Sequence, residues 1–325
     1  MTEKCSDPES RKKIIVVGAG SIGQRHAANL VKLGADISVT DVNLALLKTS
    51  CANNSWNPVV DLDAALDKDE FDAAIICTPN HLHIPSAQKA VDAGLHVFIE
   101  KPMSHNRQGV DKLLNDVKKK SLIGMGGFML RYEPGLLYLK KNLSPENVAF
   151  AQIESGSHMP TWRPGTNYRM TYSANRSMGG GIILDDVHEI DYACWLFGDP
   201  ANVRCSYGTY SNFQIDVEDT AEFQFRYPDK IVTIHSDYLQ RRYCRRCKIC
   251  LKDGNTIEWV FGKHVITYTD DTEKKFAYAD TFTVNDLYVA EMQEFLKCLT
   301  LNRNPESSLE NAAKILDIAL TAKGE

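Results

Sequence analysis

Up to about residue 127, short apolar runs alternate with longer amphipathic stretches. The runs are rich in β-branched residues and are apolar without interruption, which is typical of strands buried on both faces of a parallel sheet. Between two of them, a segment begins with Pro85, ends with Gly94 and carries an apolar stripe of Ala87, Ala90 and Val91, which predicts a crossover helix. The predicted strands of this βαβ arrangement are 14–17, 37–39, 73–77, 96–99 and 122–125.

After about residue 145 the pattern changes to alternation of apolar and polar positions, seen at 203–208 and again at 221–227. Period-two alternation predicts antiparallel strands with one packed face and one open face. Apolar stripes over 292–299 and 309–320 predict two amphipathic helices at the end of the chain, and Ser307 with Glu310 is typical of a capping box for the second.

These patterns predict two domains of different class. Residues 1–128 are expected to form an α/β domain with a doubly wound parallel sheet, and residues 129–325 an α+β domain with a mostly antiparallel, open sheet. A length of 325 residues agrees with two domains, since a domain averages roughly 150 residues.

Composition narrows the class of partner and the compartment. A net charge of -5 argues against a general nucleic-acid or anionic-membrane partner, because both select for clustered positive charge. The polar first thirteen residues lack the apolar core of a signal peptide, and no apolar stretch is long enough to cross a bilayer. Nine irregularly spaced cysteines are interpreted as free thiols. We therefore expect a cytoplasmic protein.

A glycine-rich turn follows the first predicted strand. Gly18, Gly20 and Gly23 form G-x-G-x-x-G at the head of a predicted helix, the strand–turn–helix setting in which this motif binds the pyrophosphate of a dinucleotide in a Rossmann domain. Ser21 and Ile22 lie inside the motif, where their amides would face the phosphates. A carboxylate at Asp41, after the second strand, would accept the ribose hydroxyls and repel a 2′-phosphate. The prediction is NAD, with NADP disfavoured.

Two further motifs follow later strands, at the sheet edge where α/β proteins bind ligands: Thr78-Pro79-Asn80 with His83, and Glu100-Lys101-Pro102. The chain resembles the glucose-fructose oxidoreductase, inositol dehydrogenase and rhizopine catabolism (Gfo/Idh/MocA) family over nearly its whole length. The resemblance rests on these two motifs, the glycine turn, Arg131, and Gly179-Gly180-Gly181 followed by Asp185 and His188.

The resemblance implies the site. Lys101 would lie beside nicotinamide and substrate, His188 would donate or accept the proton, and Asp185 would hold the substrate hydroxyl or tune His188 from the same helical face. A base is required because removing a hydride from an alcohol carbon also releases the hydroxyl proton, and imidazole titrates near working pH. The remaining cofactor contacts would come from the residues of the two edge motifs, which are Thr78, Pro79, Asn80, His83 and Glu100. Homodimers or homotetramers are implied through the exposed sheet face.

A subgroup pattern adds candidate substrate contacts. Trp162, Arg163, Tyr168 and Arg169, together with Arg131, are similar to a subgroup associated with surface-sugar pathways, which implies an acidic or nucleotide-linked sugar. Two positions depart from the commoner family pattern: the acid stands three residues before His188 rather than four, and Met129 replaces a polar residue. Arg163 and Arg169 could instead form structural salt bridges, and His188 could be a packing histidine bonded to Asp185.

One motif is discounted. Cys244, Cys247 and Cys250 suggest a metal site, but in a predicted strand a spacing of three places successive thiols on opposite faces, so no metal is expected.

The function predicted from these observations is reversible NAD-dependent oxidation of a hydroxyl-bearing carbon in a sugar, sugar acid or nucleotide-linked sugar. An enzyme that recycles a tightly held cofactor and a non-catalytic dinucleotide-binding sensor are the alternatives.

Overall fold

The computed structural model describes residues 11–68, 71–270 and 272–324. The chain divides into two compact units, each described here by itself. The first comprises the described residues up to Gly127 together with Tyr288–Ala313, and the second comprises Phe128–Leu287 and the residues from Lys314 onward. Within the described ranges, no helix combines the length and apolar character needed to cross a bilayer.

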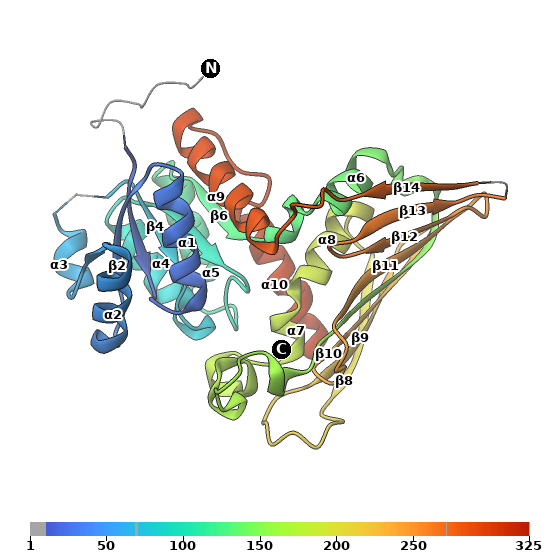
Figure 1. The fold of residues 1–325 in the computed structure, drawn as a ribbon, viewed down its shortest axis with the longest axis horizontal. Helices are drawn as coiled ribbons and strands as arrows, with labels where there is room; N and C mark the ends of the chain where they lie inside the picture. Colours follow the sequence, from blue (N-terminus) through green and yellow to red (C-terminus); the bar gives the residue numbers. More distant parts are fainter. Residues whose placement is uncertain (1–10, 69–70, 271, 325) are drawn as a thin grey trace. The chain divides into compact units, whose positions relative to one another are not determined.

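The first unit is built on a six-stranded sheet in the order β3-β2-β1-β4-β5-β6, and every pair is parallel (Figure 1). This order is the doubly wound arrangement in which the strand sequence reverses beside β1. The strands are β1 (Lys13–Val17), β2 (Asp36–Thr40), β3 (Asn57–Pro58), β4 (Ala73–Ile76), β5 (His96–Glu100) and β6 (Gly124–Gly127).

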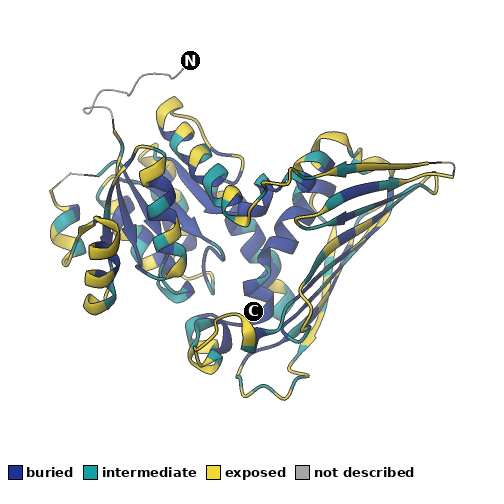
Figure 2. Ribbon diagram, in the orientation of Figure 1, coloured by how far each residue is buried: buried dark blue, intermediate teal, exposed yellow. Residues whose placement is uncertain are grey.

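The predicted apolar runs form the centre of this sheet. Ile14, Ile15 and Val16 are 0% exposed, because helices cover both faces of the parallel sheet, and Figure 2 shows these strands as buried. The helices are α1 (Ser21–Lys32), α2 (Leu44–Asn54), α3 (Leu62–Leu66), α4 (His83–Asp92), α5 (Val110–Lys119) and, from the far end of the chain, α9 (Val284–Leu301). Of α9, the part from Tyr288 onward belongs to this unit.

The second unit is built on an eight-stranded sheet in the order β14-β13-β12-β11-β7-β10-β9-β8. Only β7 and β10 pair in parallel, and all other neighbours are antiparallel. Its strands are β7 (Val148–Gly156), β8 (Asn202–Gly208), β9 (Thr220–Arg226), β10 (Ile231–Asp237), β11 (Cys244–Leu251), β12 (Thr256–Val260), β13 (His264–Tyr268) and β14 (Glu273–Ala277).

The helices of the second unit are α6 (Pro134–Asn142), α7 (Ile182–Asp185), α8 (Val187–Phe197) and the end of α10 (Leu309–Lys323), whose first residues belong to the first unit. Short 3₁₀ turns occur at η2 (Asn80–Leu82) in the first unit and, in the second, at η3 (Met129–Tyr132), η4 (Pro145–Asn147), η5 (Met159–Thr161), η6 (Tyr168–Met170), η7 (Tyr172–Ala174) and η8 (Arg176–Met178).

Alternation along the second sheet produces one packed and one open face, as the sequence predicted. In β9, Ala221, Phe223 and Phe225 are buried, while Glu222 and Gln224 between them are exposed. The cysteines of β11 follow the same rule, with Cys247 buried on the packed face and its neighbours three residues away only half-buried. The strand assigned to the cysteine motif is confirmed.

Four details differ from the sequence-based expectations. Residues 288–313 return to the first unit, so a single boundary at residue 128 does not describe the chain. The two-residue strand β3 has no apolar run and was not predicted. The last helix is capped by Ser308, whose Oγ accepts a hydrogen bond from the Asn311 amide, rather than by Ser307. Finally, Asp186 separates α7 from α8, so Asp185 and His188 are not on one continuous helix.

Candidate active site

The glycine turn after β1 has the geometry that its sequence demands. Gly18 has a φ of 110°, and a Cβ atom there would lie 2.6 Å from the carbonyl oxygen of Cys77. At Gly23 a Cβ atom would lie 1.9 Å from the carbonyl oxygen of Gly18, so any side chain would force α1 away from the turn. Gly20 differs, because nothing lies within 4 Å of its Cβ position. The first and third glycines therefore shape the turn, while the second leaves open space in front of it.

Asp41 is tied to this turn. Its Oδ2 accepts a hydrogen bond of 2.7 Å from the Ala19 amide, and its Oδ1 accepts one of the same length from the Asn43 amide. The carboxylate thus links the end of β2 to the turn. Carboxyl oxygens retain further lone pairs, so these bonds are compatible with acceptance from ribose hydroxyls.

The open space at Gly20 lies at the start of α1, where a dinucleotide would place its pyrophosphate. The amides of Ser21, Ile22 and Gly23 precede the first intrahelical bond of α1, which runs from the Gln24 amide to the Gly20 carbonyl. Such helix-start amides attract phosphate, and the absence of a side chain at Gly20 gives a phosphate room to reach them. The residues present fit a dinucleotide.

The segment after β4 is held from behind by His83. Its Nδ1 lies 2.8 Å from the Pro102 carbonyl oxygen and its Nε2 lies 2.7 Å from the Thr78 carbonyl oxygen, with the residue 1% exposed. Burial lowers the pKa of His83, although both carbonyls favour a protonated ring. With both nitrogens engaged, His83 holds the two edge motifs together, and the cofactor contact predicted for it stays a prediction. Thr78 and Pro79 are half-buried at this edge and Asn80 is buried.

Glu100 ends β5 with its carboxylate turned inward. One oxygen lies 2.6 Å from His26 Nε2, and the other accepts a hydrogen bond of 3.0 Å from the Lys101 amide. At 7% exposure it supports the backbone of Lys101, and the cofactor contact predicted for it stays a prediction. Lys101 itself is half-buried at the carboxyl end of β5, the sheet edge where ligands bind.

In the second unit, Asp185 and His188 lie on either side of the break between α7 and α8 and are 6% and 5% exposed. The Tyr238 hydroxyl donates a hydrogen bond of 2.6 Å to Asp185 Oδ2. The ring of His188 lies edge-on to Phe128 with centroids 6.2 Å apart. Tyr238 was missed by sequence reasoning, because a buried tyrosine after β10 carries no local motif.

Arg131 forms a buried ion pair in the second unit. Its Nε and Nη2 donate to Asp191 Oδ2 and Oδ1 at 2.9 and 2.6 Å, and both side chains are buried. The rings of Phe128 and Trp195 flank the guanidinium. Arg131 therefore anchors α8, the helix that carries His188, and the substrate contact predicted for it stays a prediction.

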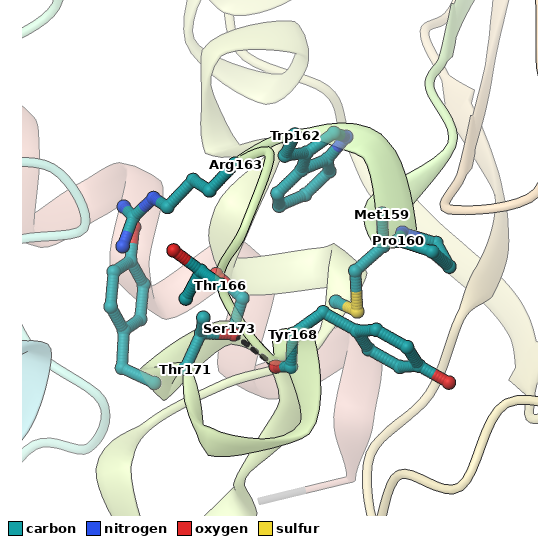
Figure 3. A pocket seen from close by; sticks show the side chains of 9 residues that line it. Met159, Pro160, Trp162, Arg163, Thr166, Tyr168, Thr171 and Ser173 are labelled. Atoms are coloured by element: carbon teal, nitrogen blue, oxygen red, sulfur yellow. Dashed lines mark hydrogen bonds between the residues drawn. The ribbon is translucent and has the colours of Figure 1, made fainter.

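The remaining substrate candidates gather around one pocket of the second unit. It is lined by Met159, Pro160, Trp162, Arg163, Thr166, Tyr168, Thr171, Tyr172 and Ser173. Figure 3 shows Trp162 and Arg163 across the pocket from Tyr168 and Thr171, and the dashed line marks the bond from Thr171 Oγ1 to the Tyr168 carbonyl oxygen.

This pocket is linked to the buried acid of α7. Trp162 packs edge-on against Tyr238 at 5.1 Å, and Tyr238 in turn bonds to Asp185. Arg169 is exposed and stacks on the Tyr168 ring at 4.8 Å. Among the described residues, no ion pair joins Arg163 or Arg169 to an acid, which leaves both guanidinium groups suited to an anionic ligand.

Comparisons with known proteins agree with both units. Residues 12–128 match the model described as "Oxidoreductase family, NAD-binding Rossmann fold", and residues 151–257 match the "GFO/IDH/MocA C-terminal domain". Levoglucosan dehydrogenase of Pseudarthrobacter phenanthrenivorans is 29% identical over 47% of this chain and 40% of its own length. Inositol 2-dehydrogenase of Paracoccus denitrificans is 30% identical over 58% of this chain and 54% of its own length, so the chain spans about half of these relatives.

A solved structure matches over almost the whole chain. UDP-N-acetylglucosamine 3-dehydrogenase from Acidithiobacillus ferrooxidans superposes with a TM-score of 0.82 at 22% identity, covering 97% of each chain, which shows a shared fold. The two matched models together span most of both units, and the glycine turn and the Glu100-Lys101-Pro102 segment lie at the ends of β1 and β5 as predicted. The chain therefore belongs to the Gfo/Idh/MocA family of oxidoreductases, whose N-terminal domain is an NAD-binding Rossmann fold.

Proposed function

We propose that this protein is an NAD-dependent oxidoreductase that moves a hydride between nicotinamide and a hydroxyl-bearing carbon of a sugar, sugar acid or nucleotide-linked sugar. The observation that carries the proposal is the open glycine turn tied to Asp41, in a chain that also holds Lys101 at the ligand edge of β5 and His188 at the start of α8. The names of the relatives, which are dehydrogenases of levoglucosan, inositol and a nucleotide sugar, support the substrate class.

When bound, NAD supplies the hydride acceptor at its nicotinamide ring. The chain's own residues then have separate roles. Lys101 orients the substrate oxygen and stabilises the negative charge that develops on it, because a cation near that oxygen lowers the energy of the transition state. His188 takes the hydroxyl proton during oxidation and returns it during reduction. Asp185, fixed by Tyr238, positions the substrate or His188.

The exposed arginines narrow the substrate class. Arg163 lines the pocket of the second unit and Arg169 lies beside it on Tyr168. A guanidinium binds carboxylate or phosphate through two parallel hydrogen bonds, which favours a sugar acid or a nucleotide-linked sugar over a neutral sugar.

Absorbance at 340 nm tests the reaction. The purified protein is incubated with NAD or NADP and a panel of free sugars, polyols, sugar acids and nucleotide-linked sugars. Reduction of NAD by the acidic classes supports the proposal. If no compound changes the absorbance although NADH binds measurably, the proposal is contradicted. Nicotinamide that stays with the protein through dialysis would then favour the enzyme that recycles its cofactor. Nicotinamide that exchanges readily would favour the sensor.

His188→Ala tests the mechanism on the substrate so found. Loss of the proton acceptor should slow hydride transfer by on the order of 100-fold while NADH affinity stays within about threefold. The matched control is His264→Ala, a half-buried histidine of β13 in the same unit. Turnover equal to that of the control would remove His188 from the mechanism.

We also propose that the chain forms a homodimer, or a tetramer of such dimers, through the open face of the second sheet. Phe150 and Ile231 are register partners on that face and are 40% and 44% exposed, an apolar pair that a second copy would cover. Phe150→Glu should convert the species to a monomer in light scattering. An unchanged mass would contradict this interface.

We propose a cytoplasmic location, because eight cysteines are free within the described residues, and unpaired thiols fit a reducing compartment. Fractionation of cells that express the natural gene tests this proposal. Recovery in the secreted fraction would contradict it.

A further inference from the structure

A buried charged cluster lies behind the Glu100-Lys101-Pro102 segment, entirely within the first unit. It consists of His26 from α1, Glu100 from the end of β5 and Glu291 from α9. One nitrogen or oxygen atom of each lies within 4.8 Å of those of the other two, and the residues are 0%, 7% and 0% exposed. Neither His26 nor Glu291 belongs to any motif singled out in the sequence.

Hydrogen bonds connect this cluster to the backbone of Lys101. His26 Nε2 lies 2.6 Å from Glu100 Oε1, and because an ionised carboxylate only accepts hydrogen bonds, the nitrogen donates. Glu100 Oε2 accepts the Lys101 amide at 3.0 Å. The carboxylate is thereby held at both ends, by a histidine on one side and by the backbone of Lys101 on the other.

The surroundings fix both partners in place. The His26 ring lies edge-on between the rings of Phe98, at 5.3 Å, and Tyr288, at 5.7 Å. The neighbouring strand leaves room for the carboxylate, because a Cβ atom at Gly127, the register partner of Glu100, would lie 3.1 Å from Glu100 Oε2. A buried, directed hydrogen bond of this kind restricts the segment that follows it.

The electrostatics agree with an ionised Glu100. Burial acts to raise the pKa of Glu100, but the hydrogen bond and charge of His26, followed by the charge and amide of Lys101, hold it below its ordinary value. The titratable groups that face this carboxylate are His26 on α1, Cys77 after β4, His83 on α4, Lys101 after β5, and Tyr288 and Glu291 on α9.

We propose that His26 is a positioning residue for hydride transfer: it holds the Glu100 carboxylate against the Lys101 amide and so fixes the direction in which Lys101 leaves β5. Glu291 lies beside this pair, with a carboxylate oxygen within 4.8 Å of the His26 nitrogen and of the Glu100 oxygen. The inference rests on the proposed function for the role of Lys101, but the His26–Glu100–Lys101 linkage itself can be tested without turnover.

A metal site made of the same three residues is a poorer fit. Two ligand atoms bound at about 2.1 Å to one ion in a tetrahedral site are roughly 3.4 Å apart. The distance of 2.6 Å between His26 and Glu100 is that of a direct hydrogen bond.

The first experiment tests the linkage between His26, Glu100 and Lys101 in the absence of substrate. Lysines are reductively methylated with ¹³C-formaldehyde, and the signal lost in Lys101→Arg identifies Lys101 in the NMR spectrum. His26→Met removes the donor at similar volume, whereas His26→Gln keeps an N–H near the position of Nε2. The Lys101 signal should move to the position of exposed lysines in His26→Met and shift much less in His26→Gln. A signal unchanged in His26→Met overturns the proposal, whatever reaction the protein catalyses.

The second experiment uses the substrate found at 340 nm. His26→Met should lower kcat by about 100-fold and His26→Gln by about tenfold or less, with the Kd of NADH within about threefold in both. The acidic limb of the kcat/KM profile should move to higher pH in His26→Met, because Glu100 loses the partner that lowers its pKa. An equal loss of kcat in the two variants, or an acidic limb that does not move in His26→Met, would show that His26 acts only in packing.

Two controls complete the test. His96→Gln replaces a histidine at the other end of β5, whose Nδ1 accepts the Ile123 amide, and it should lower thermal stability without moving the Lys101 signal or the pH profile. If His26→Met fails to fold, Glu100→Gln breaks the same linkage from the other end and should displace the Lys101 signal equally. The double variant His26→Gln/Glu100→Gln should then have a kcat only slightly below that of Glu100→Gln alone. Fully additive losses of kcat would overturn the linkage. Stoichiometric metal in the purified protein that is lost in His26→Gln would also overturn it.

Discussion

Arg131 and Asp191 form a buried ion pair with two parallel hydrogen bonds, and through it a turn before α6 holds the helix that carries His188. Both charges are almost completely removed from water, with side chains 5% and 1% exposed. A substitution that removes one of the two charges therefore leaves the other buried without its counterpart.

We predict that Arg131→Met destabilises the second unit by about 3–5 kcal/mol, because the Asp191 carboxylate loses its charged partner in a low-dielectric environment. Urea unfolding followed by tryptophan fluorescence measures this, since three of the four tryptophans, Trp162, Trp195 and Trp259, belong to that unit. The control is Arg107→Met, which removes an exposed pair with Asp111 and should cost about 0.5 kcal/mol or less. Similar losses in the two variants would show that burial of the pair has no energetic consequence.

The glycine turn gives a prediction that separates folding from cofactor binding. Gly23→Ala places a methyl group 1.9 Å from the Gly18 carbonyl oxygen, so it should destabilise the first unit by about 3 kcal/mol or more. Gly20→Ala meets nothing within 4 Å and should change stability by about 0.5 kcal/mol or less.

The same Gly20→Ala variant should nevertheless bind NADH at least about tenfold more weakly, because its methyl group occupies the space through which a phosphate reaches the helix amides. Thermal unfolding without cofactor and NADH fluorescence titration measure the two properties. Unchanged NADH affinity in Gly20→Ala would contradict the placement of the pyrophosphate at this turn.

The strands and the cofactor turn were predictable because their signals are local. Continuous apolar runs marked the central strands, and glycine spacing marked the turn at Gly18 and Gly23. The parts that were missed depend on residues far apart in the chain. No periodicity indicates that α9 returns to the first unit to bring Glu291 beside His26, or that Tyr238 bonds to Asp185 across 53 positions.

The protein contacts of the motif residues also depend on parts of the chain that lie far apart in the sequence. A motif identifies which residues gather at a sheet edge, but not which of their atoms are already engaged. Glu100, His83 and Arg131 were all predicted to touch a ligand, and each also bonds to protein partners that no motif indicated. The ligand contacts themselves stay predictions. Buried polar groups must find such partners, and sequence alone does not show which they are.

We predict that Asp41 sets the preference for NAD, and its charge can be removed with little change of shape. Asp41→Asn loses one of the two acceptors that hold the Ala19 and Asn43 amides, so both cofactors should bind more weakly. The ratio of the NADPH and NADH dissociation constants should fall by about tenfold, because a carboxylate no longer repels the 2′-phosphate. Fluorescence titration with each cofactor measures the ratio. Asp61→Asn, which removes the acidic cap of α3, is the control and should leave the ratio as it is; a ratio unchanged in Asp41→Asn as well would assign the preference to other residues.

His235 makes the stability of the second sheet depend on pH. Its Nε2 bonds to Asp237 and its Nδ1 to Glu222, at 2.9 and 2.6 Å, on the open face of β10. The hydrogen bond to Asp237, together with that to Glu222, raises the pKa of His235 to about 9, against partial burial. Because the folded-state pKa lies above the unfolded value of about 6.5, protonated His235 stabilises the fold fully below pH 6.5, and this contribution disappears as the pH rises to 9.

His235→Gln should therefore destabilise the protein by about 1–2 kcal/mol at pH 6, after allowance for solvent screening, and by much less at pH 9.5. Urea midpoints at the two pH values measure the difference. Asp237→Asn should flatten the pH dependence more than Glu222→Gln, because Asp237 makes the larger contribution to the raised pKa and is almost buried, whereas Glu222 is exposed. A destabilisation by His235→Gln that is equal at pH 6 and pH 9.5 would show that its hydrogen bonds, and not its charge, hold β9 and β10 together.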